Sequence, residues 1–183
     1  MNSTQSPWLL AANVVGYQAV WFACVAGAGR GQPWMGPVAA MAFAALTLAF
    51  GGKRDADLRT LLLVLPIGFA LDSAFAASGW MHYAQPWPWQ HAAPLWIWAL
   101  WFGFAMTLNH SLAFLGGRPW LAALLGLLGG PLAYWAANSA FGAVRFGVPI
   151  ASVLVALALA WAVTLPLLMT LNRRWASAEP APA

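Results

Sequence analysis

One uncharged stretch of 22 residues, 94–115, limits most strongly what this chain can fold into. At about 1.5 Å per residue, a helix of that length crosses a hydrocarbon core about 30 Å thick. Its last part carries four polar side chains, which are those of Thr107, Asn109, His110 and Ser111. Polar groups inside a membrane cost free energy unless they have partners, so we expect this helix to turn them toward other helices.

The composition extends this interpretation to the whole chain. Of the 183 residues, 62% are hydrophobic and only 7% are charged, whereas a soluble domain has about 25% charged residues. The sequence therefore predicts an integral membrane protein. The eight lysines and arginines are spread over short loops and form no basic patch, which argues against a nucleic-acid partner.

The expected fold class is all-α, an integral membrane bundle of six transmembrane helices that forms a single domain over residues 1–175. Glycine, proline and charged residues separate the apolar runs of the chain. These runs predict spans at about 8–28, 34–50, 58–80, 94–115, 120–140 and 148–171. The tail 176–183 is expected to be disordered.

The basic residues predict how the bundle is oriented. Six of them fall on the side of the N-terminus, namely Lys53, Arg54, Arg59, Arg118, Arg173 and Arg174. On the other side fall Arg30 and Arg145. Because loops rich in Lys and Arg stay in the cytoplasm, both termini are expected to be cytoplasmic.

Asp72 is the one carboxylate that this division places inside a span, and it is a candidate catalytic residue. It lies roughly 20 Å along the third span, toward the periplasmic half. A carboxylate at that depth can serve as a proton carrier, a cation site or a general base. The alternative is a hydrogen-bonded acid that only holds two helices together.

His110 is the second candidate catalytic residue. It can act as an acid, a base or a proton relay, it can bind a metal or haem, or it can be a packing residue. One histidine cannot form a metal site alone, and His82 and His91 lie at the opposite face of the membrane. We therefore expect neither a metal nor a cofactor.

Depth divides the remaining polar residues into two groups. In the cytoplasmic half, which also contains Ser111, we expect a hydrogen-bonded cluster of Asn13, Asn109 and His110. Tyr17, Gln18, Tyr134 and Asn138 can reach the middle or the periplasmic half, where we expect Tyr134 or Gln18 to approach Asp72. Direct pairing of Asp72 with His110 is not expected.

In the fifth span, Gly126 and Gly130 form a small-xxx-small pair, so we expect another helix to pack closely there.

Six short motifs are distributed over almost the whole chain. They are Asn13-x-x-Gly16-Tyr17-Gln18-x-x-Trp21-Phe22, Leu71-Asp72-Ser73, Pro94-Leu95-Trp96, Leu100-Trp101, Thr107-Leu108-Asn109-His110-Ser111-Leu112 and Gly129-Gly130-Pro131-Leu132-Ala133-Tyr134. Together they resemble a family of small bacterial inner-membrane proteins that is known as a domain of unknown function. The resemblance implies a multi-pass membrane protein and supplies no reaction. Members of that family are often encoded near lipid-modifying enzymes, including cyclopropane fatty-acid synthases, which implies a lipid-linked role.

Three functions remain open at this point. The first is a lipid-linked membrane enzyme or the partner of one, with Asp72 and His110 as acid/base candidates. The second is a small proton-coupled transporter that uses Asp72, and the third is a structural or assembly subunit without chemistry. Membrane lipid is the expected partner, together with another membrane protein or a lipid-modifying enzyme, and the oligomeric state is left open.

Overall fold

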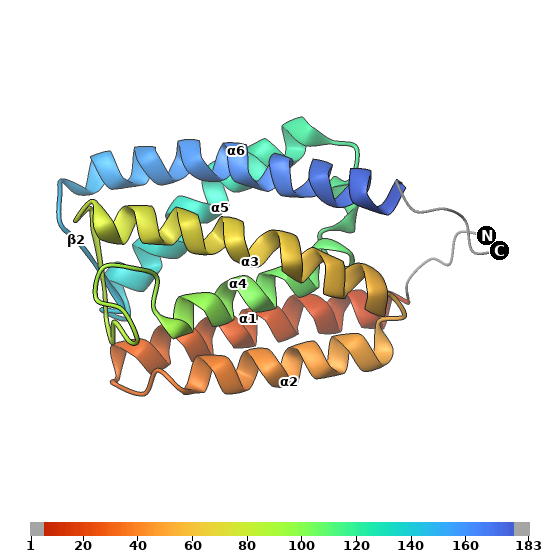
Figure 1. The fold of residues 1–183 in the computed structure, drawn as a ribbon, viewed down its shortest axis with the longest axis horizontal. Helices are drawn as coiled ribbons and strands as arrows, with labels where there is room; N and C mark the ends of the chain where they lie inside the picture. The colour runs from red at the N-terminus through yellow and green to blue at the C-terminus, as the bar shows by residue number, and fades with distance from the viewer. Residues whose placement is uncertain (1–5, 178–183) are drawn as a thin grey trace.

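A computed structural model describes residues 6–177, with side chains described through Trp175. Within these residues, six α-helices run alternately in opposite directions, and two short strands join the loops at one end of the bundle (Figure 1). The elements in chain order are α1 (Pro7–Gly29), α2 (Met35–Phe50), α3 (Arg54–Ala77), β1 (Met81–Tyr83), α4 (Leu95–Leu108), the 3-10 helix η1 (Ala113–Leu115), α5 (Pro119–Ser139), β2 (Val144–Phe146) and α6 (Ile150–Ser177). The all-helical class is confirmed, whereas the small sheet was not expected.

The described helices fall into two classes by length. Four of them, α1, α3, α5 and α6, are long and apolar enough to cross a membrane. The other two are shorter apolar helices, with 16 residues in α2 and 14 in α4. By length and composition, the chain therefore has the character of a membrane protein.

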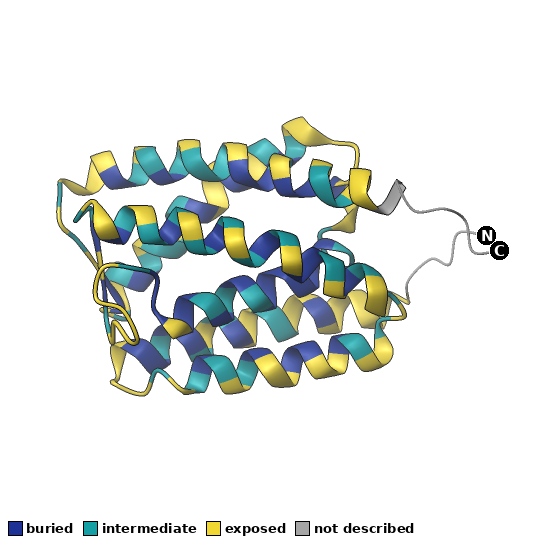
Figure 2. Ribbon diagram, in the orientation of Figure 1, coloured by how far each residue is buried: buried dark blue, intermediate teal, exposed yellow. Residues whose placement is uncertain are grey.

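The short helix α4 lies at the centre of the bundle. Ten of its 14 residues are buried, and α1, α2 and α3 pack around it (Figure 2). A helix that is apolar on all its faces is stable in such a position because every face meets apolar neighbours. The surroundings of α4 are mainly protein, so its length does not have to match the full thickness of a hydrocarbon core.

The single helix expected over 94–115 is wrong, because α4 ends at Leu108 and a turn follows. Side chains of this turn make tertiary hydrogen bonds that compete with further helix. Ser111, for example, donates its backbone N–H and its hydroxyl to Asn13 Oδ1 at 3.2 and 2.6 Å. The carbonyl of Asn109 accepts a hydrogen bond of 2.5 Å from Lys53 Nζ, and a cation at this end of a helix is favourable.

Two other helix boundaries also differ from the expected spans. α3 begins at Arg54, four residues before the expected start, with Asp55 and Asp57 in its first turn, where negative charge stabilises a helix. α6 continues to Ser177, with Arg174 in its last turn. The disordered tail expected over 176–183 therefore overlaps the end of α6, and the rest of that tail lies outside the described residues.

The two strands tie the loop after α3 to the loop after α5. They pair antiparallel, with Met81 opposite Phe146 and Tyr83 opposite Val144. Side chains alternate along β1, so Met81 and Tyr83 are buried while His82 is exposed. This alternation directs the Tyr83 side chain into the bundle.

Gly126 and Gly130 lie against α6, which confirms the close contact expected from their spacing. A Cβ atom at Gly126 would collide with the backbone carbonyl of Trp161, and one at Gly130 would collide with the Trp161 ring. By contrast, a Cβ atom at Gly129 would meet nothing within 4 Å. The absence of a side chain at Gly126 and Gly130 therefore sets the distance between α5 and α6.

We expect Gly126→Ala to lower the thermal unfolding midpoint of the detergent-solubilised protein, by the equivalent of roughly 1–3 kcal/mol, because the added methyl group forces two backbones apart. Gly129→Ala is the matched control. It should leave the midpoint unchanged or raise it, since alanine favours helix and the site is open. Equal midpoints for the two variants would contradict the close contact.

Candidate functional site

The Asp72 carboxyl group has no exposed surface and accepts hydrogen bonds from three side chains. The Tyr83 hydroxyl donates to Oδ1 at 2.6 Å, and the Tyr134 hydroxyl donates to the same oxygen. The Trp101 indole N–H donates to Oδ2 at 2.6 Å. Each oxygen atom of this buried acid therefore has at least one donor, as burial requires.

The donors to Asp72 come from three different elements, β1, α4 and α5, while Asp72 itself lies on α3. Burial raises the pKa of the Tyr83 phenol well above its ordinary value, and the Asp72 carboxyl raises it further, so Tyr83 remains protonated and donates. Tyr134 lies next to Asp72, as expected from the similar depths of the two residues along their spans. No partner of Tyr83 was expected from the sequence, because its strand lies in a loop region.

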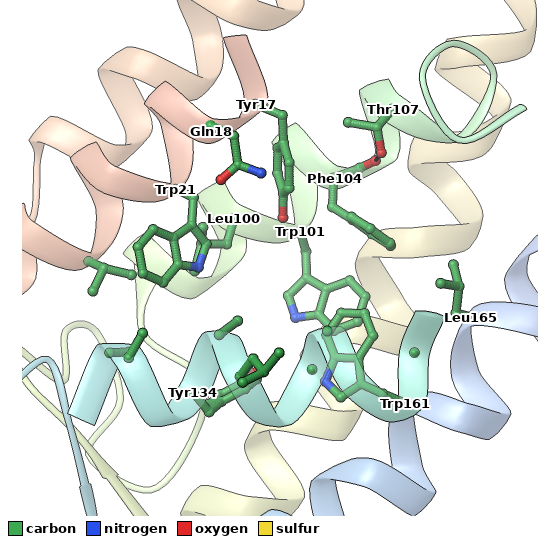
Figure 3. A pocket seen from close by; sticks show the side chains of 18 of the residues that line it. Tyr17, Gln18, Trp21, Leu100, Trp101, Phe104, Thr107, Tyr134, Trp161 and Leu165 are labelled. Atoms are coloured by element: carbon green, nitrogen blue, oxygen red, sulfur yellow. Dashed lines mark hydrogen bonds between the residues drawn. The ribbon is translucent and has the colours of Figure 1, made fainter. Parts of the chain in front are cut away.

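A cleft of about 510 Å³ lies beside this carboxyl group, between α1, α4, α5 and α6. Tyr134 and Trp101 form part of its wall (Figure 3). Because both residues also donate to Asp72, they lie between the cleft and the carboxyl group. None of the described residues that line it carries a formal charge, and most are aliphatic or aromatic. On α1 the lining runs from Val14 to Val25, which corresponds to about 16 Å along the helix axis.

The cleft exists because the helices pack in two groups. α1, α2 and α3 pack around α4, whereas α5 packs mainly on α6 and contacts the rest through β2, η1 and the Tyr134–Asp72 hydrogen bond. Exposed apolar side chains border the opening between α1 and α5, including Val14 at 46%, Leu125 at 40% and Leu132 at 60%. The cleft therefore opens toward the side of the bundle, where the hydrocarbon core of a membrane would lie.

Stacked indole rings form the inner wall of the cleft. Trp101 and Trp161 are parallel within 5°, with ring centroids 5.0 Å apart. Trp101 lies over Gly68 of α3, and Trp161 lies over Gly130 of α5. Each ring therefore occupies the space that a glycine leaves open on a neighbouring helix.

A second polar cluster lies where α3 begins and α6 ends. His110 Nε2 is 2.9 Å from Asp57 Oδ2, and the two side chains are 4% and 0% exposed. Asn109 donates to Asp57 Oδ1 and to the Thr60 hydroxyl, both at 2.9 Å. Asn172 donates to Asn109 Oδ1 at 2.8 Å and accepts from the Thr60 hydroxyl at 2.8 Å. The cluster thus joins α3, the turn after α4, and α6.

Asn13 and Ser111 form an adjoining part of this cluster. Asn13 donates to the carbonyl of Met106 at 3.0 Å and accepts two hydrogen bonds from Ser111. The four residues expected in the cytoplasmic half therefore lie at one end of the bundle. His110 and Asn109 bind toward α3 and α6, while Ser111 binds toward α1.

His110 pairs with Asp57 and lies far from Asp72. The two carboxylates are 15 residues apart on α3, which corresponds to roughly 22 Å along the helix axis. The expected absence of a direct Asp72–His110 pair agrees with this separation. Asp57 was missed as a second buried carboxylate, because the charged run around it was interpreted as a loop.

The remaining expected residues have separate positions. Asn138 donates to the carbonyl of Val144 at 2.9 Å and so positions β2. Gln18 lines the cleft and does not bind Asp72 in the described structure. Among the described residues, no group of three or more His, Cys, Asp or Glu side chains could hold a metal ion.

Several residues of these networks could not be found from the sequence. They are Asp57, Thr60, Tyr83 and Asn172. Trp101 belongs to one of the sequence motifs, but its hydrogen bond to Asp72 was not expected. Asp57 and Thr60 are three residues apart, a spacing that places both on one face of a helix, and this was the available signal. No such signal was available for Tyr83 and Asn172. Tyr83 lies in a loop region, and Asn172 lies at the end of an expected span.

We expect Tyr134→Phe to destabilise the protein by about 1–2 kcal/mol, because a buried carboxyl oxygen loses a donor. Tyr17→Phe is the matched control, since the Tyr17 hydroxyl has no hydrogen bond to any described residue. The thermal unfolding midpoints of both variants in detergent test this. Equal midpoints would show that the Tyr134–Asp72 hydrogen bond does not stabilise the fold.

Comparison with known families gives one match. Residues 10–167 match the family described as "Protein of unknown function (DUF2878)", which confirms the resemblance found in the sequence motifs. No match was found among curated proteins or among solved structures.

Proposed function

We propose that this chain, which belongs to the DUF2878 family, is a multi-pass bacterial inner-membrane protein that binds the hydrocarbon chain of a membrane lipid between α1 and α5. The observation that carries the proposal is the uncharged cleft of about 510 Å³. A cleft of this volume falls within the usual range for ligand sites, which are mostly apolar with a few polar groups. Water gains little in such a space, whereas a lipid chain fills it with van der Waals contacts.

The position of the opening supports entry from the bilayer. Phe22, at 53% exposure, and Leu132, at 60%, stand on opposite sides of the opening on α1 and α5. Apolar side chains with that exposure are stable where lipid surrounds them. A lipid chain therefore reaches the cleft sideways and does not have to cross water.

The chemistry beside the cleft supports a lipid-linked role in two forms. Tyr134 lines the cleft and also donates to Asp72, so a phenol–carboxyl pair stands at the wall that a lipid would touch. Such a pair is suited to acid–base catalysis on a bound lipid. In the other form, the protein holds the lipid and presents it to a separate lipid-modifying enzyme.

A proton-coupled transporter that uses Asp72 receives less support. Leu61 and Val64 lie on the face of α3 between Asp57 and Asp72, and both are buried among apolar neighbours. On this face, α3 itself therefore carries no polar side chain between Thr60 and Asp72. A purely structural role receives less support as well, because a structural bundle has no use for a large lateral cleft.

The lipid proposal predicts a specific effect of filling the cleft. Gly129 lines it and a Cβ atom there meets nothing within 4 Å, so Gly129→Phe should enter the cleft without disturbing the fold. We expect this variant to purify with its usual stability but with the specifically retained lipid reduced at least tenfold, as measured by mass spectrometry of extracted lipids. Leu128→Phe is the control, because Leu128 is 54% exposed and lies outside the cleft lining.

Whole-cell lipid profiles separate the two forms of the proposal. If the protein is the enzyme, folded Asp72→Asn and Gly129→Phe variants should both give the lipid profile of cells that lack the protein. If it presents lipid to another enzyme, Gly129→Phe should give the lipid profile of cells that lack the protein, whereas Asp72→Asn should give the wild-type profile. Retention of the same lipid by wild type and Gly129→Phe would contradict lipid binding in the cleft.

We also propose six spans with both termini in the cytoplasm, with α2 and α4 as the two short spans. The support is the alternation of helix direction together with the six basic residues at the end where α1 begins and α6 ends. A cysteine at the exposed position Gln90 should react with an impermeant thiol reagent in intact spheroplasts, and one at the exposed position Asp55 should react only after lysis. Buried Cys24 gives little background. Reaction in the reverse order would contradict this orientation.

A further inference from the structure

Two polar side chains stand at the cleft without a partner in the described chain. The Gln18 amide and the Tyr17 hydroxyl have no hydrogen bond to any described residue, and both residues line the cleft. Figure 3 shows both side chains projecting from α1 into the space that faces Tyr134 on α5. The indole N–H of Trp161, another lining residue, is buried and also has no partner among the described residues.

The depth of Gln18 makes this absence of a partner costly in a membrane. Gln18 is exposed and lies 11 residues from each end of α1, at Pro7 and Gly29. It therefore sits about 16 Å from either end of the helix, at the middle of the hydrocarbon core. An amide at that depth without a hydrogen-bonding partner is strongly unfavourable in lipid, so its partner is something other than a lipid tail.

The charges around the cleft restrict what that partner can be. No Lys, Arg or His is among the described residues that line it, and the nearby Asp72 carboxyl already accepts three hydrogen bonds. A carboxylate or phosphate group would have no cation to pair with. The available groups are hydroxyl, amide and indole donors, which suit a neutral oxygen acceptor.

We propose that the cleft binds a neutral lipid that presents a carbonyl oxygen to Gln18 and Tyr17 at the middle of the membrane. This inference rests on the proposed lipid cleft and names the chemical class of its ligand. A glycerophospholipid is a poor fit, because its headgroup and ester groups stay near the membrane surface. Quinones with an isoprenoid tail and neutral acyl esters both carry the required carbonyl, and the aromatic wall suits a flat ring as well as a chain.

Competition binding to the full-length protein in nanodiscs tests this proposal. A pyrene-labelled alkane occupies the cleft, and four unlabelled competitors of matched chain length displace it: an alkane, an acyl methyl ester, a short-tailed ubiquinone and a fatty acid at a pH where it is ionised. We expect the ester or the quinone to displace the probe at a concentration about tenfold lower than the alkane, as one hydrogen bond can provide. The ionised fatty acid should show no such advantage. Whichever carbonyl compound is stronger identifies the source.

Variants of the two side chains provide the decisive comparison. Gln18→Leu and Tyr17→Phe should remove most of the carbonyl advantage while the plain alkane still binds. Gln90→Leu is the control, since Gln90 is exposed in the loop before α4 and lies outside the cleft lining. The expected result is a loss confined to the first two variants.

Three results would overturn the inference in distinguishable ways. If the alkane and the carbonyl compounds compete equally, the cleft binds chains without recognising a carbonyl, and the proposed function survives. If Gln18→Leu changes the oligomeric state and not the competition, the amide binds a second copy of the chain across the membrane. If the labelled alkane itself does not bind, the lipid cleft fails together with this inference.

Discussion

Burial of the Asp72 carboxyl group is the constraint on which the rest of the bundle depends. Neither water nor lipid can satisfy its oxygen atoms, so protein donors must reach it. These donors come from β1, α4 and α5, which means that three elements of the fold have to meet at one point on α3. The small sheet follows from this requirement, because the pairing of β1 with β2 holds Tyr83 in place. A shift of any one of these elements leaves a donor or an acceptor unsatisfied.

The cleft follows from the same arrangement. Trp101 donates to Asp72 and lies over Gly68, and its other face stacks on Trp161, which in turn lies over Gly130. Two indole rings thus stand between the α3–α4 pair and the α5–α6 pair. Because the rings hold these two helix pairs apart, α5 does not pack closely along the length of α1. An apolar space therefore remains between α1 and α5. Tyr134 connects that space to the carboxyl group.

Much of this arrangement could be predicted from the sequence, and the reasons are physical. The number and order of the helices followed from apolar runs, and Gly126 and Gly130 marked a close helix contact by their spacing alone. The approach of Tyr134 to Asp72 followed from their depths. Depth depends on position along a helix, which sequence order determines directly.

Other features depend on contacts that sequence order does not reveal. α4 ends at Leu108 because Asn109 and Ser111 bind other helices, and hydrophobicity alone favoured a helix to Leu115. Asp57 lies just before the third span expected from the sequence, although it pairs with His110 inside the bundle. The cleft also could not be predicted, since a cavity depends on how side chains from four helices fail to fill the space between them.

The central claim, that the lateral cleft holds a specific lipid, is tested most directly by photocrosslinking in the native membrane. A photoreactive amino acid at position 129 lies in the cleft, and the same residue at position 128 faces outward. The account predicts that position 129 crosslinks mainly one class of neutral lipid, enriched well above its abundance in the membrane, while position 128 crosslinks lipids in proportion to their abundance. Crosslinks from position 129 that match the bulk composition would contradict the account.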